Sequence, residues 1–212
     1  TLQLDFSDCD MNNDQAIAEL GVAVSELASL SSFSLDLQIK SKYGNIIEKM
    51  VDSLKLLKNL AYLHLGFEGR ELKSDDLQQF FSNLRSLKSL KSLKSLTLRF
   101  SQEKEMIDNH FEILAQSLKE MTQLRNLTLN FGYANLITNQ GVAALACGIQ
   151  ELKSLIGLSL KFGFHDKIQM AIERISEALI HLPRLYSVEM HFILCQKLGD
   201  FGGLFGVLKQ MK

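Results

Sequence analysis

The chain has 212 residues, of which 46% are hydrophobic and 22% charged, so it can bury a substantial core and is not predicted to be disordered. Its 23 basic and 24 acidic residues nearly cancel, which leaves no overall field to attract nucleic acid, an anionic membrane or an acidic substrate. No apolar run approaches the roughly 20 residues that span a bilayer, so we expect no membrane insertion. Residues 1–6 do not resemble a signal peptide. Unless an upstream targeting segment is missing, we expect an intracellular, cytoplasmic chain.

In chain order, the first predicted element is a strand at residues 2–6, where apolar and polar residues alternate. An amphipathic helix over residues 17–27 and a second strand at residues 30–37 follow. The same alternation continues to the end of the chain. The later strands are predicted at residues 60–67, 93–100, 124–131, 155–162 and 185–192, and the later helices at 47–57, 77–87, 111–121, 142–152, 172–182 and 201–211.

The strands share the motif LxxLxLxF, whose last three apolar positions alternate with polar or small residues, as in a strand with one buried face. Counting back from the first leucine of each copy, apolar residues stand 3, 6, 10 and 13 positions earlier, close to the spacing of one helix face. Before Leu124 these residues are Met121, Leu118, Leu114 and Phe111, and before Leu30 they are Leu27, Val24, Leu20 and Ile17.

One strand and one helix form a unit of about 30 to 33 residues that cannot bury its own apolar face. About seven such units are predicted to stack into an α/β solenoid with a parallel sheet on one side and helices on the other. Because helices are wider than strands, the stack should bend into an arc with the sheet concave and the helices convex. With one proline and no flexible linker, residues 1–212 are expected to form a single domain. Neither end has a polar capping unit, so we expect a fragment, the ordered part of a longer chain, or ends that are covered by partners.

The fourth unit is irregular, because its helical stripe points to Leu90 as the first strand leucine whereas the strand motif points to Leu93. The three extra residues should lengthen the helix end or bulge the turn into the strand. A tolerated surface duplication is favoured over a partner-docking feature, since loops accept insertions readily.

These repeats resemble the ribonuclease-inhibitor-like class of leucine-rich repeats over essentially the whole chain, and the LxxLxLxF variant is similar to large repeat families of ciliated protozoa. The resemblance implies a curved solenoid that binds partners and has no fixed catalytic activity. One departure is the position where the family usually has asparagine, which here holds Ser7, Gln38, Glu68, Ser101, Gly132, Gly163 and Ile193. A recurring phenylalanine one position earlier should instead stack as an aromatic spine in the core.

Strand residues that point away from the core are the candidates for a binding face, although a merely solvated sheet surface is an equal alternative. This row is acidic at its beginning and more basic after Arg99, which would orient a partner of complementary charge. The candidate residues are Asp5, Asp36, Tyr62, His64, Thr97, Arg99, Asn126, Thr128, Asn130, Ser159, Lys161, Glu189 and His191.

A basic edge with no acidic residue between positions 85 and 99 is a second candidate surface, made of Arg85, Lys88, Lys91 and Lys94 together with Arg99. Phosphate contacts are conceivable there. No aromatic residues or nucleic-acid motif accompany it, so a solvated helix edge is favoured and nucleic-acid binding is not expected.

Signatures of catalysis are missing: the sequence has no P-loop, GxSxG, HExxH or dinucleotide fingerprint, and we predict no enzyme activity and no cofactor. The histidines lie in different units without metal-ligand spacing, at His64, His110, His165, His181 and His191, so no metal is predicted. The cysteines lack a CxxC spacing and are expected to be small buried residues, at Cys9, Cys147 and Cys195.

The sequence therefore favours a non-catalytic protein-protein interaction module, an assembly scaffold that is a subunit of a larger complex, with unknown protein partners. A cytoskeletal or ciliary setting would follow from the resemblance to ciliate repeats. The alternative is the recognition or regulatory part of a larger enzyme, such as a kinase, ubiquitin ligase or GTPase-activating protein. RNA binding through the basic edge is a third, less favoured hypothesis.

Overall fold

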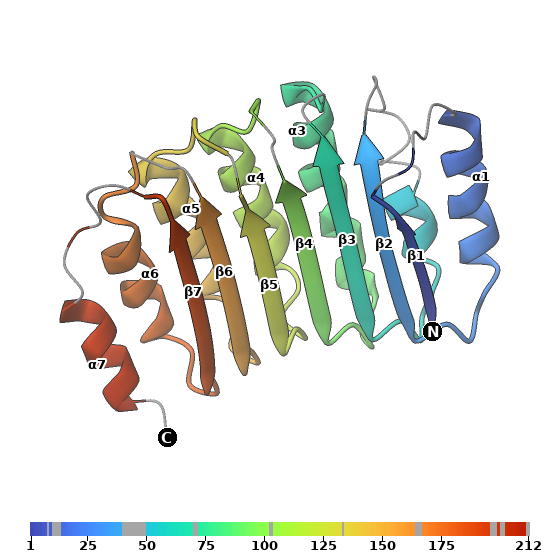
Figure 1. Ribbon diagram of the computed structural model, residues 1–212. Coiled ribbons are helices and arrows are strands. Elements are labelled where there is room, and N and C mark those ends of the chain that lie inside the picture. The colour runs from blue at the N-terminus through green and yellow to red at the C-terminus, as the bar shows by residue number, and fades with distance from the viewer. Residues whose placement is uncertain are drawn as a thin grey trace.

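The computed structural model describes residues 1–7, 9, 14–39, 50–69, 72–101, 104–132, 134–163, 167–195, 199 and 202–210. Within these residues, seven strands form one parallel sheet whose spatial order follows the chain order (Figure 1). The strands are β1 (Leu2–Phe6), β2 (Ser32–Ile39), β3 (Tyr62–Gly69), β4 (Ser95–Ser101), β5 (Asn126–Phe131), β6 (Gly157–Gly163) and β7 (Ser187–Ile193). The predicted parallel sheet is confirmed.

Helices connect consecutive strands and lie behind the sheet in Figure 1, so the described helices cover only one of its two faces. They are α1 (Asp14–Ser25), α3 (Ser74–Asn83), α4 (Asp108–Lys119), α5 (Asn139–Ile149), α6 (Ala171–Leu179) and α7 (Gly202–Gln210), and residues 50–54 are also helical. This confirms the predicted alternation of strand and helix. Among the described residues, no helix is long and apolar enough to cross a membrane.

The irregular fourth unit lengthens its helix. A 3-10 helix, η1 (Leu84–Ser89), continues directly from α3 and takes up the three extra residues. Leu90 and Leu93 are both fully buried, and the Leu93 amide donates a hydrogen bond to the Leu90 carbonyl at 3.0 Å. The two apolar patterns that conflict in the sequence are therefore both satisfied, because Leu90, directly after η1, and Leu93, in the turn that leads into β4, are both buried.

The core lies between the sheet and the helices, and its strand side is built by identical positions in consecutive units. Leu96 of β4 pairs in register with Leu127 of β5, for example, and both are buried. The predicted aromatic spine is confirmed. Ring centroids of neighbouring units lie 5.5, 6.2, 6.0 and 5.7 Å apart along the series Phe67, Phe100, Phe131, Phe162 and Phe192.

The prediction that the apolar stripe of each helix is buried is wrong at the two ends of the helix layer. Leu27 is 44% exposed and Leu208 is 50% exposed, although both were expected to be buried. The physical reason is position: α1 and α7 stand at the ends of the row of helices in Figure 1, so each packs against one neighbouring unit only. In α7 it is Val207 that is buried. Ile47, Phe201 and Met211, also assigned to such stripes, lie outside the described residues.

The expectation of buried cysteines is also wrong. Cys9 and Cys147 are exposed and Cys195 is half-buried. Cys147 follows the buried Ala146 in α5, and one residue of helix rotates it by about 100°, away from the sheet. Cysteine content alone does not reveal this helical phase.

Candidate binding face of the sheet

The sheet face that points away from the helices is called the open face below. Strand register arranges its side chains in rows that run across the strands, and one of them is called the central row: Asp5, Asp36, Gly66, Arg99, Asn130, Lys161 and His191. The adjoining row holds His64, Thr97, Thr128, Ser159 and Glu189, and the row before it holds Tyr62 and Asn126. All thirteen predicted face residues thus lie on one surface.

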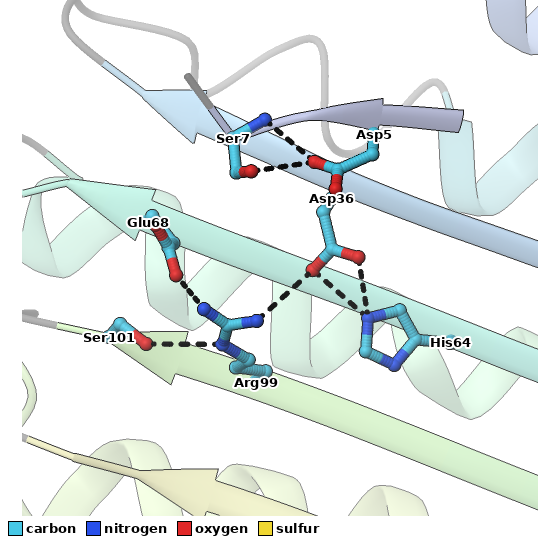
Figure 2. Close-up of polar contacts among 7 residues, drawn as sticks. All are labelled: Asp5, Ser7, Asp36, His64, Glu68, Arg99 and Ser101. Carbon is cyan, nitrogen blue, oxygen red and sulfur yellow. Dashed lines mark hydrogen bonds and ion pairs between the residues drawn. The ribbon is translucent and has the colours of Figure 1, made fainter. Parts of the chain in front are cut away.

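A network of charged side chains crosses β2, β3 and β4 on the open face (Figure 2). The His64 Nε2 atom lies 3.0 and 3.1 Å from the two carboxylate oxygens of Asp36. On the other side of Asp36, the Arg99 guanidinium approaches the same carboxylate at 3.8 Å and forms an ion pair with Glu68. Asp36 therefore lies between His64 and Arg99.

Gly66 makes this arrangement possible. It stands between Asp36 and Arg99 in the central row, and any Cβ built on it would overlap the Asp36 carboxylate. Because glycine leaves that space free, the Asp36 side chain extends across β3. There it contacts His64, which belongs to the same strand as Gly66. The side chain of Asp36 is only 15% exposed and that of His64 only 20%, although both lie on an uncovered sheet surface.

The first strand adds a further carboxylate, Asp5. Its carboxylate accepts hydrogen bonds from the Ser7 hydroxyl at 2.6 Å and the Ser7 amide at 3.0 Å. These two hydrogen bonds, with a smaller contribution from Arg99, hold the pKa of Asp5 below its ordinary value. Asp5, Asp36 and Glu68 outnumber the cations beside them, so the β1 to β3 part of the face carries negative charge at neutral pH.

The β5 to β7 part of the face is less tightly connected. Glu189 lies 2.9 Å from His191 and accepts a hydrogen bond of 2.9 Å from the Ser159 hydroxyl. The hydrogen bond with His191, followed by that with Ser159, lowers the pKa of the Glu189 carboxyl. Lys161 makes no hydrogen bond or ion pair with the part of the chain that the structure describes. The central row therefore holds one cation that has no partner among the described residues.

The basic edge is partly neutralised. Glu120, at the end of α4, contacts Arg85 at 2.6 Å and Lys88 at 3.3 Å. The hydrogen bond from Arg85, followed by that from Lys88, lowers the pKa of Glu120. Lys91 and Lys94 lie beside each other, with the Lys94 amine donating to the Lys91 carbonyl at 3.2 Å. This edge therefore presents less free positive charge than its sequence indicates, which weakens the case for phosphate contacts.

Sequence reasoning missed Glu68, Ser101 and Glu120 as partners in these clusters. Glu68 and Ser101 lie on β3 and β4, two residues beyond Gly66 and Arg99 of the central row. Extending the two-residue alternation of each strand by one step would have placed them on the open face. Glu120 follows Arg85 and Lys88 by about one repeat length, so aligning consecutive units would have brought it next to them.

Among the described residues, no group of three or more His, Cys, Asp or Glu side chains is arranged to hold a metal ion. His165 lies outside them, and the remaining histidines occupy separate environments. Neither protein-family models nor curated protein sequences give a match to this chain.

Proposed function

We propose that this chain is a leucine-rich-repeat solenoid of the ribonuclease-inhibitor-like class, with a concave sheet whose open face binds a partner protein as part of a larger, non-catalytic assembly. One observation carries this proposal: the described helices cover one face of a parallel sheet and leave the other uncovered across seven strands. Parallel sheets are otherwise almost always covered on both faces. A concave, partner-binding sheet is the usual reason for leaving such a surface free.

The size of the open face fits one protein partner. Strands about 4.8 Å apart and about 20 Å long give seven strands a surface on the order of 600 Å². Each partner in a stable protein complex buries about 800 Å², so a partner would cover the whole face and extend onto the residues at its edges. The side chains available for contact include Tyr62, which is 53% exposed, and Arg99. Tyrosine and arginine are residue types that often dominate binding energy.

The proposal is tested with two arginine substitutions in the same unit. Thr128→Arg places a large cation in the middle of the open face, whereas Gln116→Arg places it on the exposed side of α4. The tagged full-length protein is expressed in its native cell, and its complexes are separated by size-exclusion chromatography. We expect Thr128→Arg to leave the complex and Gln116→Arg to remain in it. Retention of both variants, or loss of Gln116→Arg alone, would refute binding through the open face.

A further inference from the structure

A hollow of about 530 Å³ lies on the open face where β4, β5 and β6 end. Its lining includes Arg99, Asn130 and Lys161 of the central row together with Ser101, Gly132 and Gly163. The carboxyl ends of parallel strands are where open α/β sheets commonly bind ligands. This hollow is separate from the Asp36 and His64 contact and shares Arg99 and Ser101 with the network in Figure 2.

The hollow exists because two units replace a side chain by glycine. In the row that holds Glu68 and Ser101, the next two units have Gly132 and Gly163. A Cβ on Gly163 would overlap the carbonyl oxygen of Gly132, so the strand ends approach too closely there for any other residue. No side chain therefore occupies the space at these two positions, between Arg99 and Lys161; Gly132 is half-buried there and Gly163 is buried.

The charges around the hollow select an anion. None of its lining residues is acidic, and two of them are cations. Arg99 is already paired with Glu68 and approaches Asp36, whereas Lys161 has no partner among the described residues. A single unpaired cation matches a singly charged carboxylate better than a phosphate, which carries about two charges and is usually held by several donors.

Asn130 lies between the two cations in the central row and also lines the hollow. Its side-chain oxygen is buried and has no hydrogen-bond partner in the described part of the chain, but that oxygen is an acceptor and does not pair with a carboxylate. The donor that Asn130 offers to a carboxylate is its side-chain NH2 group. Beside the hollow, Ile193 is 42% exposed and offers an apolar surface for the methylene groups of a longer side chain.

We propose that this hollow binds one acidic side chain, an aspartate or glutamate of the partner protein, with its carboxylate held by Lys161. The inference rests on the proposed function, because it names the chemical group of the partner that the open face recognises. Arg99 and the side-chain NH2 group of Asn130 orient the carboxylate. Gly132 and Gly163 have no side chains that would fill the space it occupies. A partner segment held at the hollow in this way would bind the open face in one register only. The negatively charged network of β1 to β3 would repel an acidic side chain placed there instead.

The first test uses a small probe and needs no partner. The amide resonances of Gly132 and Gly163 are followed by NMR while N-acetylglutamate N-methylamide is added at constant ionic strength. The matched control is N-acetylglutamine N-methylamide, which has nearly the same shape and no charge. We expect saturable shifts in the millimolar range with the glutamate probe only. Equal behaviour of the two probes would overturn the proposal.

Two variants locate the binding. Lys161→Met should weaken binding of the glutamate probe by about tenfold, the loss of one charge-assisted hydrogen bond. Lys153→Met should not change it, because Lys153 lies outside the hollow, in the turn between α5 and β6. Gly132→Asp places a carboxylate inside the hollow, where a Cβ meets no atom closer than 3.8 Å, and should block the probe without unfolding the chain. Full binding by both Lys161→Met and Gly132→Asp would contradict the assignment.

Failure of this inference can be told from failure of the proposed function. If Thr128→Arg leaves the native complex while Lys161→Met stays in it and the probes behave equally, the open face binds a partner and the carboxylate site is wrong. If Thr128→Arg stays in the complex, the proposed function fails whatever the probes do. If Thr128→Arg and Lys161→Met both leave the complex and the glutamate probe alone binds, both proposals stand.

Discussion

Gly148 of α5 lies directly against Ala115 of α4, so close that a Cβ on Gly148 would stand 2.6 Å from the Ala115 Cα atom. On its other side, α4 has a polar contact with α3: the buried Ser117 hydroxyl donates a hydrogen bond of 2.6 Å to the Phe81 carbonyl. Neighbouring helices thus contact each other through small residues. This lets the helices pack closely enough to match the short spacing of the strands in the sheet.

Replacing Gly148 by alanine should destabilise the protein by about 1–3 kcal/mol, because the added methyl meets backbone that cannot move aside. Gly206→Ala in α7 is the matched control, since its Cβ meets nothing within 4 Å. That change should stabilise the helix by about 0.5–1 kcal/mol. Urea denaturation of the two variants measures the difference. A Gly148→Ala variant as stable as the parent would show that α4 and α5 are not packed as described.

His110 should make the protein less stable in mild acid. Its side chain is fully buried, its Nε2 atom donates to the Ser74 carbonyl at 2.9 Å, and its Nδ1 atom accepts from the Ile107 amide at 3.0 Å. Both ring nitrogens are satisfied in the neutral form. Burial lowers the pKa of His110, and the Ser74 carbonyl and nearby Asp75 oppose this only in part.

The direction of this pH effect follows from the linkage between folding and protonation of His110. Below about pH 6.5, the ordinary histidine pKa, the unfolded chain takes up a proton at this position that the folded chain does not yet bind. The stabilising contribution is therefore present above that pH and is lost as the pH falls toward the lower folded pKa. Chemical denaturation between pH 7 and pH 5 should show this loss in the parent and in His181→Gln, whose side chain is exposed, but not in His110→Gln. An unchanged slope in His110→Gln would rule out this origin.

Inside and outside positions of β5 are tested by adjacent aspartates. Leu129 is fully buried, so Leu129→Asp would bury an unpaired charge and should abolish cooperative folding. Asn130 faces the open side, and Asn130→Asp should fold normally. Thermal melts followed by circular dichroism compare them, and equal losses would mean that the two faces of the strand have been exchanged.

Arg99 should contribute modestly to stability through the open-face network. Arg99→Met leaves Glu68 and Asp36 without their shared cation and should cost on the order of 1 kcal/mol at low ionic strength, since the guanidinium is 39% exposed. In 1 M salt, where the screening length is about 3 Å, most of the difference should disappear. Arg125→Met removes an exposed arginine for which the described structure shows no ion pair and is the control. A cost that salt does not change would indicate lost packing instead of charge.

The sequence predicts the sheet well because one short motif repeats with the same spacing. Leu65, Leu98 and Leu129 hold equivalent motif positions, and the structure pairs them in register. The alternation inside each strand also assigns residues to the open face correctly. Leu27 and Cys147 show the limit of this reasoning: exposure depends on which neighbouring unit covers a helix and on its rotation, and neither is written in one unit's pattern.

The contacts of the candidate site were harder to foresee. The Asp36 and His64 contact depends on the missing side chain of Gly66, and the hollow beside Lys161 depends on Gly132 and Gly163. Both features depend on contacts between units, at positions where a neighbouring strand has no side chain. The pattern of a single unit therefore predicts which residues lie on the open face but not which of them contact each other.

Binding through the open face is tested most directly by placing a photo-activated cross-linking amino acid at Thr128 or, in a separate sample, at Gln116 of the full-length protein in its native cell. Mass spectrometry then identifies what each position touches. The account predicts reproducible cross-links from Thr128 to a segment of another protein, and none to that segment from Gln116. Cross-links to the partner from Gln116 alone would contradict it, because the partner would then contact the helix layer and leave the open face free.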